Sequence, residues 1–556
     1  MGIYLNLLKL NTYLKKCKFN FFAGIAGMII CSIIYIPIPY LMGYIIDKVL
    51  IPHKSYMELY KIIGILILLH LVKYIISIIS QSLFIKVQNF VVNEVRVSMM
   101  NKIMDLPMSF LNKKEKGYVL GRISECENIG NLFSPMFINT FLGIFDFSFA
   151  LIMMFTLSFK LSIIVLLIVP IYFLTVKHSS NQLSESTESL LETGAILNGE
   201  IYEVLNGIEE IKILNGKKVQ LKKFKKKLNE LVKNSIKQSK QILIFMENIL
   251  FINNLSSVLI LLFSGIWILN DQLTIGIYTA FIAYMNNIFA TTSNLASLGM
   301  TVKPVCVSIE RIQEFLEIDD ENTTEEHEIM NEHIISISIE NLSFKYDENS
   351  KNIIDKLNLK LNKGDKILIK GENGTGKSTL IKNLLGLYSP TEGEIFINDK
   401  KYSLIDKRNV RNKIGVVSQN IFLFRGSVLD NILYGQTDKH KKDVVSLIKE
   451  YNLEKYIQRF ENGLETEISQ NSVGISGGQS QIIAFLRAII SKKDVIILDE
   501  GTSNIDAETR NIILKILEER NICNILIIIS HQEDRLDFIN KTLHLEKPTN
   551  NCLAPT

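Results

Sequence analysis

The chain has 556 residues, of which 47% are hydrophobic and only 21% are charged, and its mean hydropathy is +0.21. This composition excludes a disordered, collagen-like or small disulfide-bonded protein. The net charge of +4 is too small to predict nucleic-acid binding. The six cysteines are scattered without a C-x-x-C pair, so they indicate neither a zinc site nor a disulfide framework.

Long apolar runs occupy the first 300 residues and are missing from the rest. Each run approaches the ~20 residues that an α-helix needs to cross about 30 Å of hydrocarbon. Buried core helices are the alternative, but so many long runs in one half favour a membrane domain. We therefore predict six transmembrane helices, at residues 20–46, 58–83, 133–157, 161–178, 242–268 and 275–298.

Lysine and arginine are unevenly distributed over the segments that join these spans. They are rare in the alternate short segments and frequent in 9–18, 86–122 and 212–240. By the positive-inside rule, both termini and the two long loops are predicted to be cytoplasmic. The lysines of 212–240 lie between two spans, so a solvated face beside the inner leaflet is a better interpretation than a nucleic-acid patch.

The composition changes at residues 317–333, which are acidic and poor in apolar residues. We predict a linker there, between a membrane domain at 1–316 and a second domain at 334–556. The second domain alternates short β-type runs with helical stretches, which is typical of an α/β fold with a parallel sheet.

Residues 371–379 read GENGTGKST and follow the predicted strand 366–370. This is the P-loop pattern G-x-x-x-x-G-K-S, in which glycines let backbone N–H groups surround phosphate oxygens at a helix N-terminus. Lys377 is expected to reach the β- and γ-phosphates, and Ser378 to bind Mg²⁺. The predicted ATP-binding residues of this loop are Gly371, Asn373, Gly374, Thr375, Gly376, Lys377, Ser378 and Thr379.

An apolar run at 495–498 ends in two carboxylates, Asp499 and Glu500. A buried strand that delivers an aspartate to the metal beside a bound nucleotide is the Walker B arrangement. Glu500 is then placed to polarise the attacking water. A strand that merely ends in two acidic residues is the alternative, but it loses weight about 120 residues after a P-loop.

Between these motifs the sequence reads ISGGQ, and here the chain resembles the ABC transporter family, whose signature is LSGGQ. Further motifs follow the family's order. They are the aromatic residue that stacks on adenine (Tyr346), the Q-loop (Gln419), the signature (Ser476, Gly477, Gly478 and Gln479), the D-loop (Ser503 and Asp506) and the switch histidine (His531).

The resemblance implies a P-loop ATPase of the ABC type. Gln419, Glu500 and His531 are then expected to act in catalysis. Ser378, Gln419 and Asp499 are expected to hold Mg²⁺ beside ATP. The chain departs from the family at Ser480–Ile482, where basic residues are common, and at Gly501, where alanine is usual. These departures remove no catalytic group and affect the expected rate and regulation only.

The membrane half also resembles the family, namely its exporter-type half-transporters, in which six helices precede one nucleotide-binding domain. Leu106-Pro107, Phe110 and Arg122 match its first cytoplasmic loop, and residues 310–316 match the end of its sixth span. The resemblance implies that the loop tips near 113–121 and 208–216 are the coupling helices.

One chain carries one P-loop and one signature. In this family the signature of one subunit covers the ATP that the P-loop of the other subunit holds, so the resemblance implies a dimer. Because the P-loop, the signature, Glu500 and His531 are all intact, a homodimer is favoured, and a heterodimer stays open.

Polar groups inside the predicted spans are candidates for a substrate cavity. They are His70, Lys73, Asp146 and Glu247. The alternative is that Lys73 and Asp146 neutralise each other and that Glu247 reaches the membrane interface.

The function predicted is ATP-driven export of an amphipathic or hydrophobic substrate, with a peptide favoured over a drug or lipid. The alternatives are an importer of siderophore type on the same fold, and an ATP-gated sensor without net transport. Abundant isoleucine, asparagine and lysine suggest an AT-rich genome. Such a genome favours a bacterial source. Together with the six predicted spans, it predicts a multi-pass protein of the plasma membrane, in contact with lipid.

Overall fold

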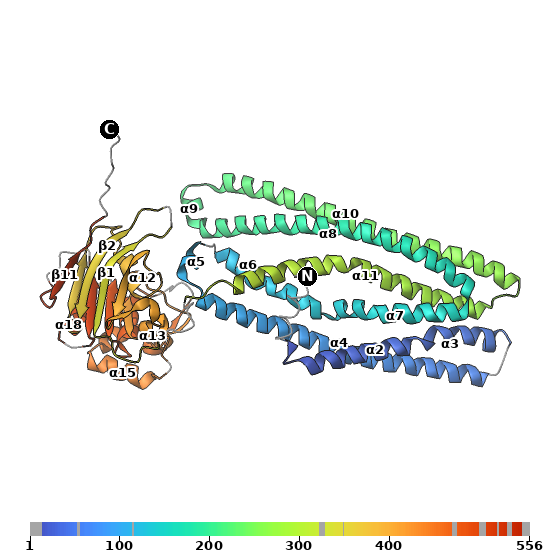
Figure 1. The fold of residues 1–556 in the computed structure, drawn as a ribbon, viewed down its shortest axis with the longest axis horizontal. Helices are drawn as coiled ribbons and strands as arrows, with labels where there is room; N and C mark the ends of the chain where they lie inside the picture. The colour runs from blue at the N-terminus through green and yellow to red at the C-terminus, as the bar shows by residue number, and fades with distance from the viewer. Residues whose placement is uncertain are drawn as a thin grey trace. The chain divides into compact units, whose positions relative to one another are not determined.

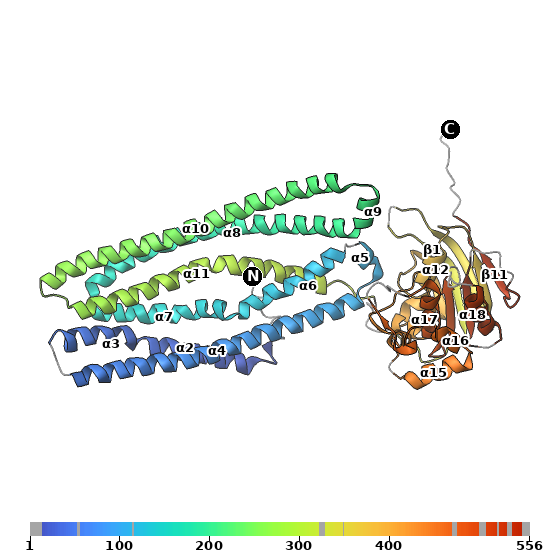
Figure 2. The ribbon, with the colours of Figure 1, turned by 180° about the vertical axis from the view of Figure 1, so that it is seen from behind.

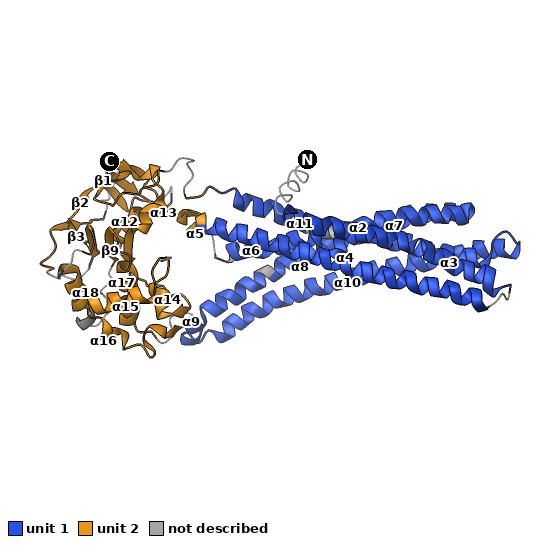
Figure 3. Cartoon of the chain, turned by 90° about the horizontal axis from the view of Figure 1, so that it is seen from below, with its two compact units in different colours: residues 1–104, 115–318 blue, residues 105–114, 319–556 orange. Residues whose placement is uncertain are grey.

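The computed structural model describes residues 14–52, 56–113, 116–321, 328–347, 350–436, 438–469, 475–499, 507–519, 522–530 and 536–547. The chain divides into two compact units, which Figure 3 shows in blue and orange. Unit 1 comprises residues 1–104 and 115–318, and unit 2 comprises 105–114 and 319–556. The predicted linker 317–333 spans the later division, and its residues 322–327 lie outside the described residues.

Helices make up the described part of unit 1. In Figures 1 and 2, α8 runs beside α10, and α7 runs beside α11. The elements are α2 (Lys18–Tyr35), α3 (Pro37–Ile45), the π-helical turn η1 (Ile46–Leu50), α4 (Tyr56–Asp105), α6 (Lys116–Gly130), η2 (Asn131–Phe133), α7 (Pro135–Leu157), α8 (Phe159–Asn206), α9 (Ile208–Ile213), α10 (Lys217–Leu269) and α11 (Ile275–Leu316).

Five helical stretches among the described residues are long and apolar enough to cross a membrane, at 18–50, 56–105, 118–157, 159–206 and 217–269. Their surfaces fit lipid, because large apolar side chains such as Leu68 and Leu167 are 60% and 67% exposed. The stretches are longer than the predicted spans. The 48 residues of α8, for example, extend about 72 Å at ~1.5 Å per residue, far beyond the hydrocarbon layer.

The sixth predicted span, 275–298, forms the first part of α11, which is not one of these five stretches. Asn286 and Asn287 interrupt its apolar run. The sixth membrane crossing therefore stays a prediction.

Hydroxyl side chains begin the helices where the chain turns sharply. The Oγ of Ser134 accepts the N–H of Phe137 at the start of α7, and Ser158 does the same for Leu161 at the start of α8. Such caps satisfy amide groups that the first helical turn cannot pair. They allow α7 and α8 to be joined with Ser158 as the only residue between them.

Unit 2 contains two main sheets. The antiparallel sheet has the order β2-β1-β4-β5, and the parallel sheet has the order β11-β3-β10-β9-β6. The strands are β1 (Ser336–Phe344), β2 (Ile354–Asn362), β3 (Lys366–Lys370), β4 (Glu392–Ile397), β5 (Lys400–Lys401), β6 (Ile414–Val417), β7 (Gly426–Ser427), β8 (Glu467–Ile468), β9 (Val495–Asp499), β10 (Ile525–Ile529) and β11 (Lys541–His544). The longer helices are α12 (Lys377–Leu384), α15 (Lys441–Glu450), α17 (Gly477–Ile489) and α18 (Ala507–Glu519), and the shorter ones are α5 (Met108–Lys113), α13 (Lys407–Asn412), α14 (Val428–Ile432) and α16 (Glu454–Ile457).

The central strands β9 and β10 are buried on both faces, as near-continuous runs of isoleucine, valine and leucine require. Alternate residues of each strand serve different cores. Ile496 and Leu498 join the core that contains α17, whereas Val495 and Ile497 join the core that contains α12. This double burial confirms the predicted parallel α/β sheet.

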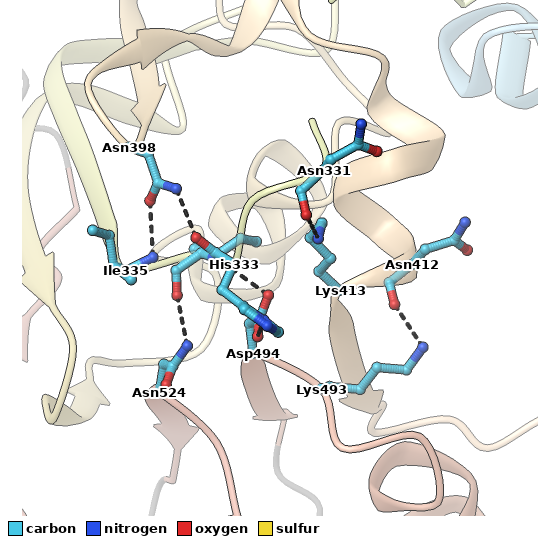
Figure 4. A network of polar contacts seen from close by, with 10 residues as sticks. Asn331, His333, Ile335, Asn398, Asn412, Lys413, Lys493, Asp494 and Asn524 are labelled. Carbon is cyan, nitrogen blue, oxygen red and sulfur yellow. Dashed lines mark hydrogen bonds and ion pairs between the residues drawn. The ribbon is translucent and has the colours of Figure 1, made fainter. Parts of the chain in front are cut away.

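A polar network fixes the start of the sheet domain to the beginning of β9, as Figure 4 shows. Asp494 is 7% exposed, and its carboxylate accepts the N–H of Ile334 at 3.0 Å and contacts the His333 ring at 2.7 Å. Asn524 donates to the carbonyl of Ile334, and Asn398 accepts the N–H of Ile335. Because the His333 side chain is largely exposed, the buried bond to Ile334 contributes most of the stabilisation.

Replacing Asp494 by alanine should destabilise unit 2, because the buried N–H of Ile334 would lose its acceptor. An unsatisfied buried donor costs about 2 kcal/mol, which corresponds to a fall of roughly 5 °C in melting temperature for a unit of this size. Thermal unfolding of the purified protein in detergent measures this change. Glu461→Ala, at an exposed turn, is the control and should leave the melting temperature unchanged. Equal melting temperatures for both variants would contradict the assignment.

Candidate functional site

The P-loop connects β3 to α12, as the sequence predicts for a phosphate-binding loop. Gly374 and Gly376 have φ values of +83° and +95°, which other residues adopt only with strain. A Cβ on Gly376 would also lie 3.0 Å from the side chains of Ile353 and Ile354. Both glycines are therefore required by the shape of the loop.

The lysine of the P-loop is held inside it. Lys377 is 6% exposed, and its Nζ donates to the carbonyl oxygens of Gly371 and Glu372, both at 2.8 Å. Ser378, the next residue, is exposed in the first turn of α12. The ammonium group of Lys377 and the exposed hydroxyl of Ser378 therefore both lie at the N-terminus of α12. This arrangement suits the phosphate groups of a nucleotide and the metal ion that accompanies them.

The parallel sheet brings three predicted site segments to one edge. In the strand register, Ile369 of β3 pairs with Ile529 of β10, and Ile529 pairs with Asp499 of β9. Leu498 pairs with Val417 at the end of β6, two residues before Gln419. With about 4.8 Å between neighbouring strands, β3 and β6 are separated by roughly 14 Å at this edge. The P-loop, Asp499 and Gln419 therefore share the carboxyl edge of the sheet.

Three residues at this edge carry oxygen ligands of the kind that Mg²⁺ prefers: Ser378, Gln419 and Asp499. Asp499 is 8% exposed at the last position of β9, whereas Gln419 and Ser378 are exposed. The arrangement fits a metal held between the sheet edge and a nucleotide. The catalytic candidates Glu500 and His531, with Ser503 and Asp506, lie outside the described residues, so their roles stay predictions.

The signature begins α17. Ser476 caps the helix, because its Oγ accepts the N–H of Gln479 while the side chain of Gln479 accepts the N–H of Ser476 at 2.8 Å. Ser476 and Gly477 are exposed. This capping box orients the helix N-terminus outward, where its amide groups favour an anion.

A half-buried arginine joins the signature helix to the segment after Gln419. The guanidinium of Arg487 donates to the backbone carbonyls of Asn431 and Phe422 and to the side chain of Asn431. Burial lowers the pKa of Arg487 from its usual value. Asn431, which is 1% exposed, also bonds to both backbone groups of Phe424. Asn431 belongs to no motif, so sequence patterns did not predict its role.

Tyr346, the predicted adenine-stacking residue, belongs to an aromatic cluster. Its hydroxyl lies 3.1 Å from the Oγ1 of Thr379 in the P-loop helix. Its ring meets those of Phe344 and Tyr388 edge to face, with centroids 5.0 Å and 5.2 Å away. These contacts hold Tyr346 beside the P-loop.

Helix α5 belongs to unit 2, although it lies in sequence between two helices of unit 1. The amide of Asn112 donates to the hydroxyl of Tyr388, and Lys113 pairs with Asp347 at 3.3 Å. The sequence missed the contact between Asn112 and Tyr388, because 276 residues separate the two positions. The loop tip predicted at 113–121 was placed too late, since the segment that packs into unit 2 is 105–114.

The four candidates for the substrate cavity separate into two groups. Lys73 and Asp146 line one cavity of about 330 Å³ in unit 1. His70 and Glu247 are exposed and do not line it, and the His70 ring contacts the carbonyl of Leu66 in its own helix at 2.8 Å.

Comparison with known proteins connects both units to one family. Residues 21–292 match the family model of the ABC transporter transmembrane region, and residues 354–503 match that of the ABC transporter. The YgaD protein of Bacillus subtilis, named as a multidrug export ATP-binding/permease protein, is 24% identical over 97% of this chain and 94% of its own length. A similarly named protein of Staphylococcus aureus is 27% identical over 96% of this chain and 94% of its own length.

A further relative carries a peptide substrate in its name. The lactococcin-A transport/processing ATP-binding protein LcnC of Lactococcus lactis is 27% identical over 80% of this chain. The match covers 61% of the length of that protein.

Replacing Tyr346 by alanine should weaken ATP binding about ten-fold, because stacking of a base on an aromatic ring contributes about 1–3 kcal/mol. Tyr346→Phe keeps the ring and loses only the hydroxyl contact with Thr379, so its affinity should stay within about three-fold of the native value. Competition with a fluorescent ATP analogue measures both. Equal losses in the two variants would show that the hydroxyl, and not stacking, binds the nucleotide.

Proposed function

Given that the chain belongs to the ABC transporter family, with the membrane and ATP-binding regions fused, we propose that it exports an amphipathic or hydrophobic substrate from the cytoplasm. The fused regions indicate ATP hydrolysis coupled to transport by a multi-pass membrane protein. A peptide is the favoured substrate, and the name of the lactococcal relative supports this choice. Both termini are proposed to be cytoplasmic, since the cation-rich segments flank the same side of the spans.

The placement of α5 is the observation that carries this proposal. Asn112 of α5 contacts Tyr388, and Tyr388 contacts the ring of Tyr346 beside the P-loop. Helix α5 continues in sequence from α4 and precedes α6. A change at the nucleotide can therefore reach two long helices through side chains in direct contact, as a transporter driven by ATP requires.

Catalysis is proposed to follow from the residues at the sheet edge. Lys377 neutralises phosphate charge, Ser378, Gln419 and Asp499 hold Mg²⁺, and Glu500 orients the attacking water with the help of His531. Phosphoryl transfer depends mainly on positioning and on stabilisation of charge, and Mg²⁺ supplies part of that charge when bound.

A dimer is proposed because each chain leaves complementary surfaces exposed. The N-terminus of α17 exposes Ser476 and Gly477 for the ATP of a second subunit. At the tip of α9, Ile213 and Leu214 are 73% and 78% exposed beside an apolar hollow of about 610 Å³. Apolar side chains on a hydrated tip favour burial against a second subunit. We favour a homodimer over a heterodimer, because the signature and the P-loop are both intact.

The Glu500→Gln variant tests the ATP-driven step. It should bind ATP with Mg²⁺ but hydrolyse it at least 100-fold more slowly, so that the nucleotide-binding halves of two subunits stay together. Spin labels on the two halves should then show a shorter distance with ATP than without it. The Ser476→Arg variant in the same background is the control and should prevent closure. A distance that does not respond to ATP would contradict the proposed dimer.

The direction of transport is tested with membrane vesicles that contain the native chain. Inside-out vesicles should accumulate a labelled peptide when ATP is added outside, because the nucleotide-binding half then faces the ATP. Accumulation only in right-side-out vesicles would indicate an importer. ATP-dependent conformational change without flux of any peptide, dye or lipid would indicate a sensor.

The Asn112→Ala variant tests the path through α5. Its basal ATPase rate should stay unchanged, whereas the stimulation of this rate by substrate should fall at least about five-fold, because Tyr388 loses its partner in α5. Lys113→Ala is the matched control, since its ion pair with Asp347 is exposed and contributes little. ATPase assays in proteoliposomes measure both. Equal stimulation in both variants would show that Asn112 does not transmit the signal.

A further inference from the structure

Four helices of unit 1, α2, α4, α7 and α11, line the cavity of about 330 Å³. Their lining side chains are mostly polar, although α2, α4 and α7 belong to stretches that are long and apolar enough to cross a membrane. On α4 the polar positions are Lys73, Ser77 and Gln81, at intervals of four residues, which places them on one helical face. A polar face directed into a cavity within a membrane domain is costly and points to function.

Lys73 and Asp146, the two charged residues of the cavity, form no ion pair with each other within the described residues. The ammonium of Lys73 lies 4.3 Å from the centroid of the Tyr35 ring, where a cation is stabilised by the ring face. The cavity therefore contains a cation on one wall and a separate carboxylate on another.

Two buried acceptors on α7 lack donors within the described residues. They are the Oδ1 atoms of Asp146 and Asn139, which both line the cavity. The residues are seven apart, so they lie on the same face of the helix. A buried acceptor without a hydrogen bond costs about 1–3 kcal/mol, and more when it is charged. Both atoms are therefore suited to a ligand that brings N–H donors.

We propose that this cavity binds the transported substrate through an ammonium group that donates to Asp146 and Asn139, with a carbonyl or carboxylate oxygen directed to Lys73. This proposal rests on the export function proposed above and narrows its substrate class. Charge-assisted hydrogen bonds require both partners, so an uncharged lipid tail or aromatic dye would leave the two charges unmatched. The ends of a short peptide supply both groups, and the cavity volume lies at the lower limit of ligand pockets.

Equilibrium binding in detergent without nucleotide tests the cavity. The probes are a labelled hydrophobic dipeptide with a free amino terminus and the same peptide with an acetylated amino terminus. Asp146→Asn should raise the Kd of the free peptide about ten-fold, as expected for loss of one charge-assisted bond. Acetylation should weaken binding to the native chain by a similar factor. The two changes should not add, because each removes the same interaction.

Glu247→Gln is the matched control, because it neutralises an exposed carboxylate of unit 1 that does not line the cavity. Its Kd for both peptides should equal that of the native chain. A second variant, Lys73→Gln, should weaken binding of the peptide that has a free carboxyl terminus but not of its carboxy-terminal amide. This variant tests the proposal if Asp146→Asn fails to fold. Equal effects of Asp146→Asn on the free and the acetylated peptide would overturn the proposal, as would equal effects of Lys73→Gln on the acid and the amide.

Flux in vesicles separates this inference from the export function. If binding depends on Asp146 but ATP does not drive movement of the peptide, the proposed binding site is supported and the proposed export function is contradicted. If the native chain and Asp146→Asn show equal ATP-driven movement and equal Kd values, the proposed export function is supported and the proposed binding site is contradicted.

Discussion

The interaction on which the coupling argument depends joins Asn112 of α5 to Tyr388 of the nucleotide-binding unit. Helix α5 is covalently continuous with α4 and α6, but its contacts place it in unit 2. Tyr388 is 8% exposed and packs against Phe344 as well as Tyr346. Close-packed side chains transmit a displacement because they have no free volume to absorb it. This packing, together with the ion pair between Arg408 and Asp105, holds the segment 105–114 in the unit that contains the P-loop.

A second set of contacts within unit 2 joins the segment after Gln419 to the signature helix α17. Arg487 of α17 donates to the carbonyl of Phe422, three residues after Gln419, and Asn431 of α14 bonds to Arg487 and to the backbone of Phe424. Removal of these acceptors would leave a partly buried guanidinium without its hydrogen bonds. The network therefore makes α17 follow the segment that begins at Gln419. The segment after Gln419 and the signature helix are in this way connected through direct contacts.

The sequence was sufficient for the parts of the molecule that local patterns encode. Glycine spacing at Gly374 and Gly376 predicted a phosphate-binding loop, and the apolar run at 495–498 predicted a buried strand. Contacts between distant residues were beyond such patterns. The bond between Asn112 and Tyr388 and the network around Asp494 depend on tertiary packing, and no periodicity indicates them. The loop tip predicted at 113–121 was placed too late for the same reason, because helical spacing does not show which turn packs into another unit.

Lys73 and Asp146 illustrate how far charge alone can be interpreted in a membrane segment. The sequence offered four polar candidates, and packing selects the two whose side chains reach the cavity. Asn287 and Thr291 of α11, which is not one of the five long apolar stretches, also line this cavity. A helix that gives polar side chains to a cavity loses hydropathy in the segment that must cross the membrane. The polar residues Asn287 and Thr291 lower the hydropathy of α11, which is the physical reason why a hydropathy pattern alone identifies this helix less clearly than the others.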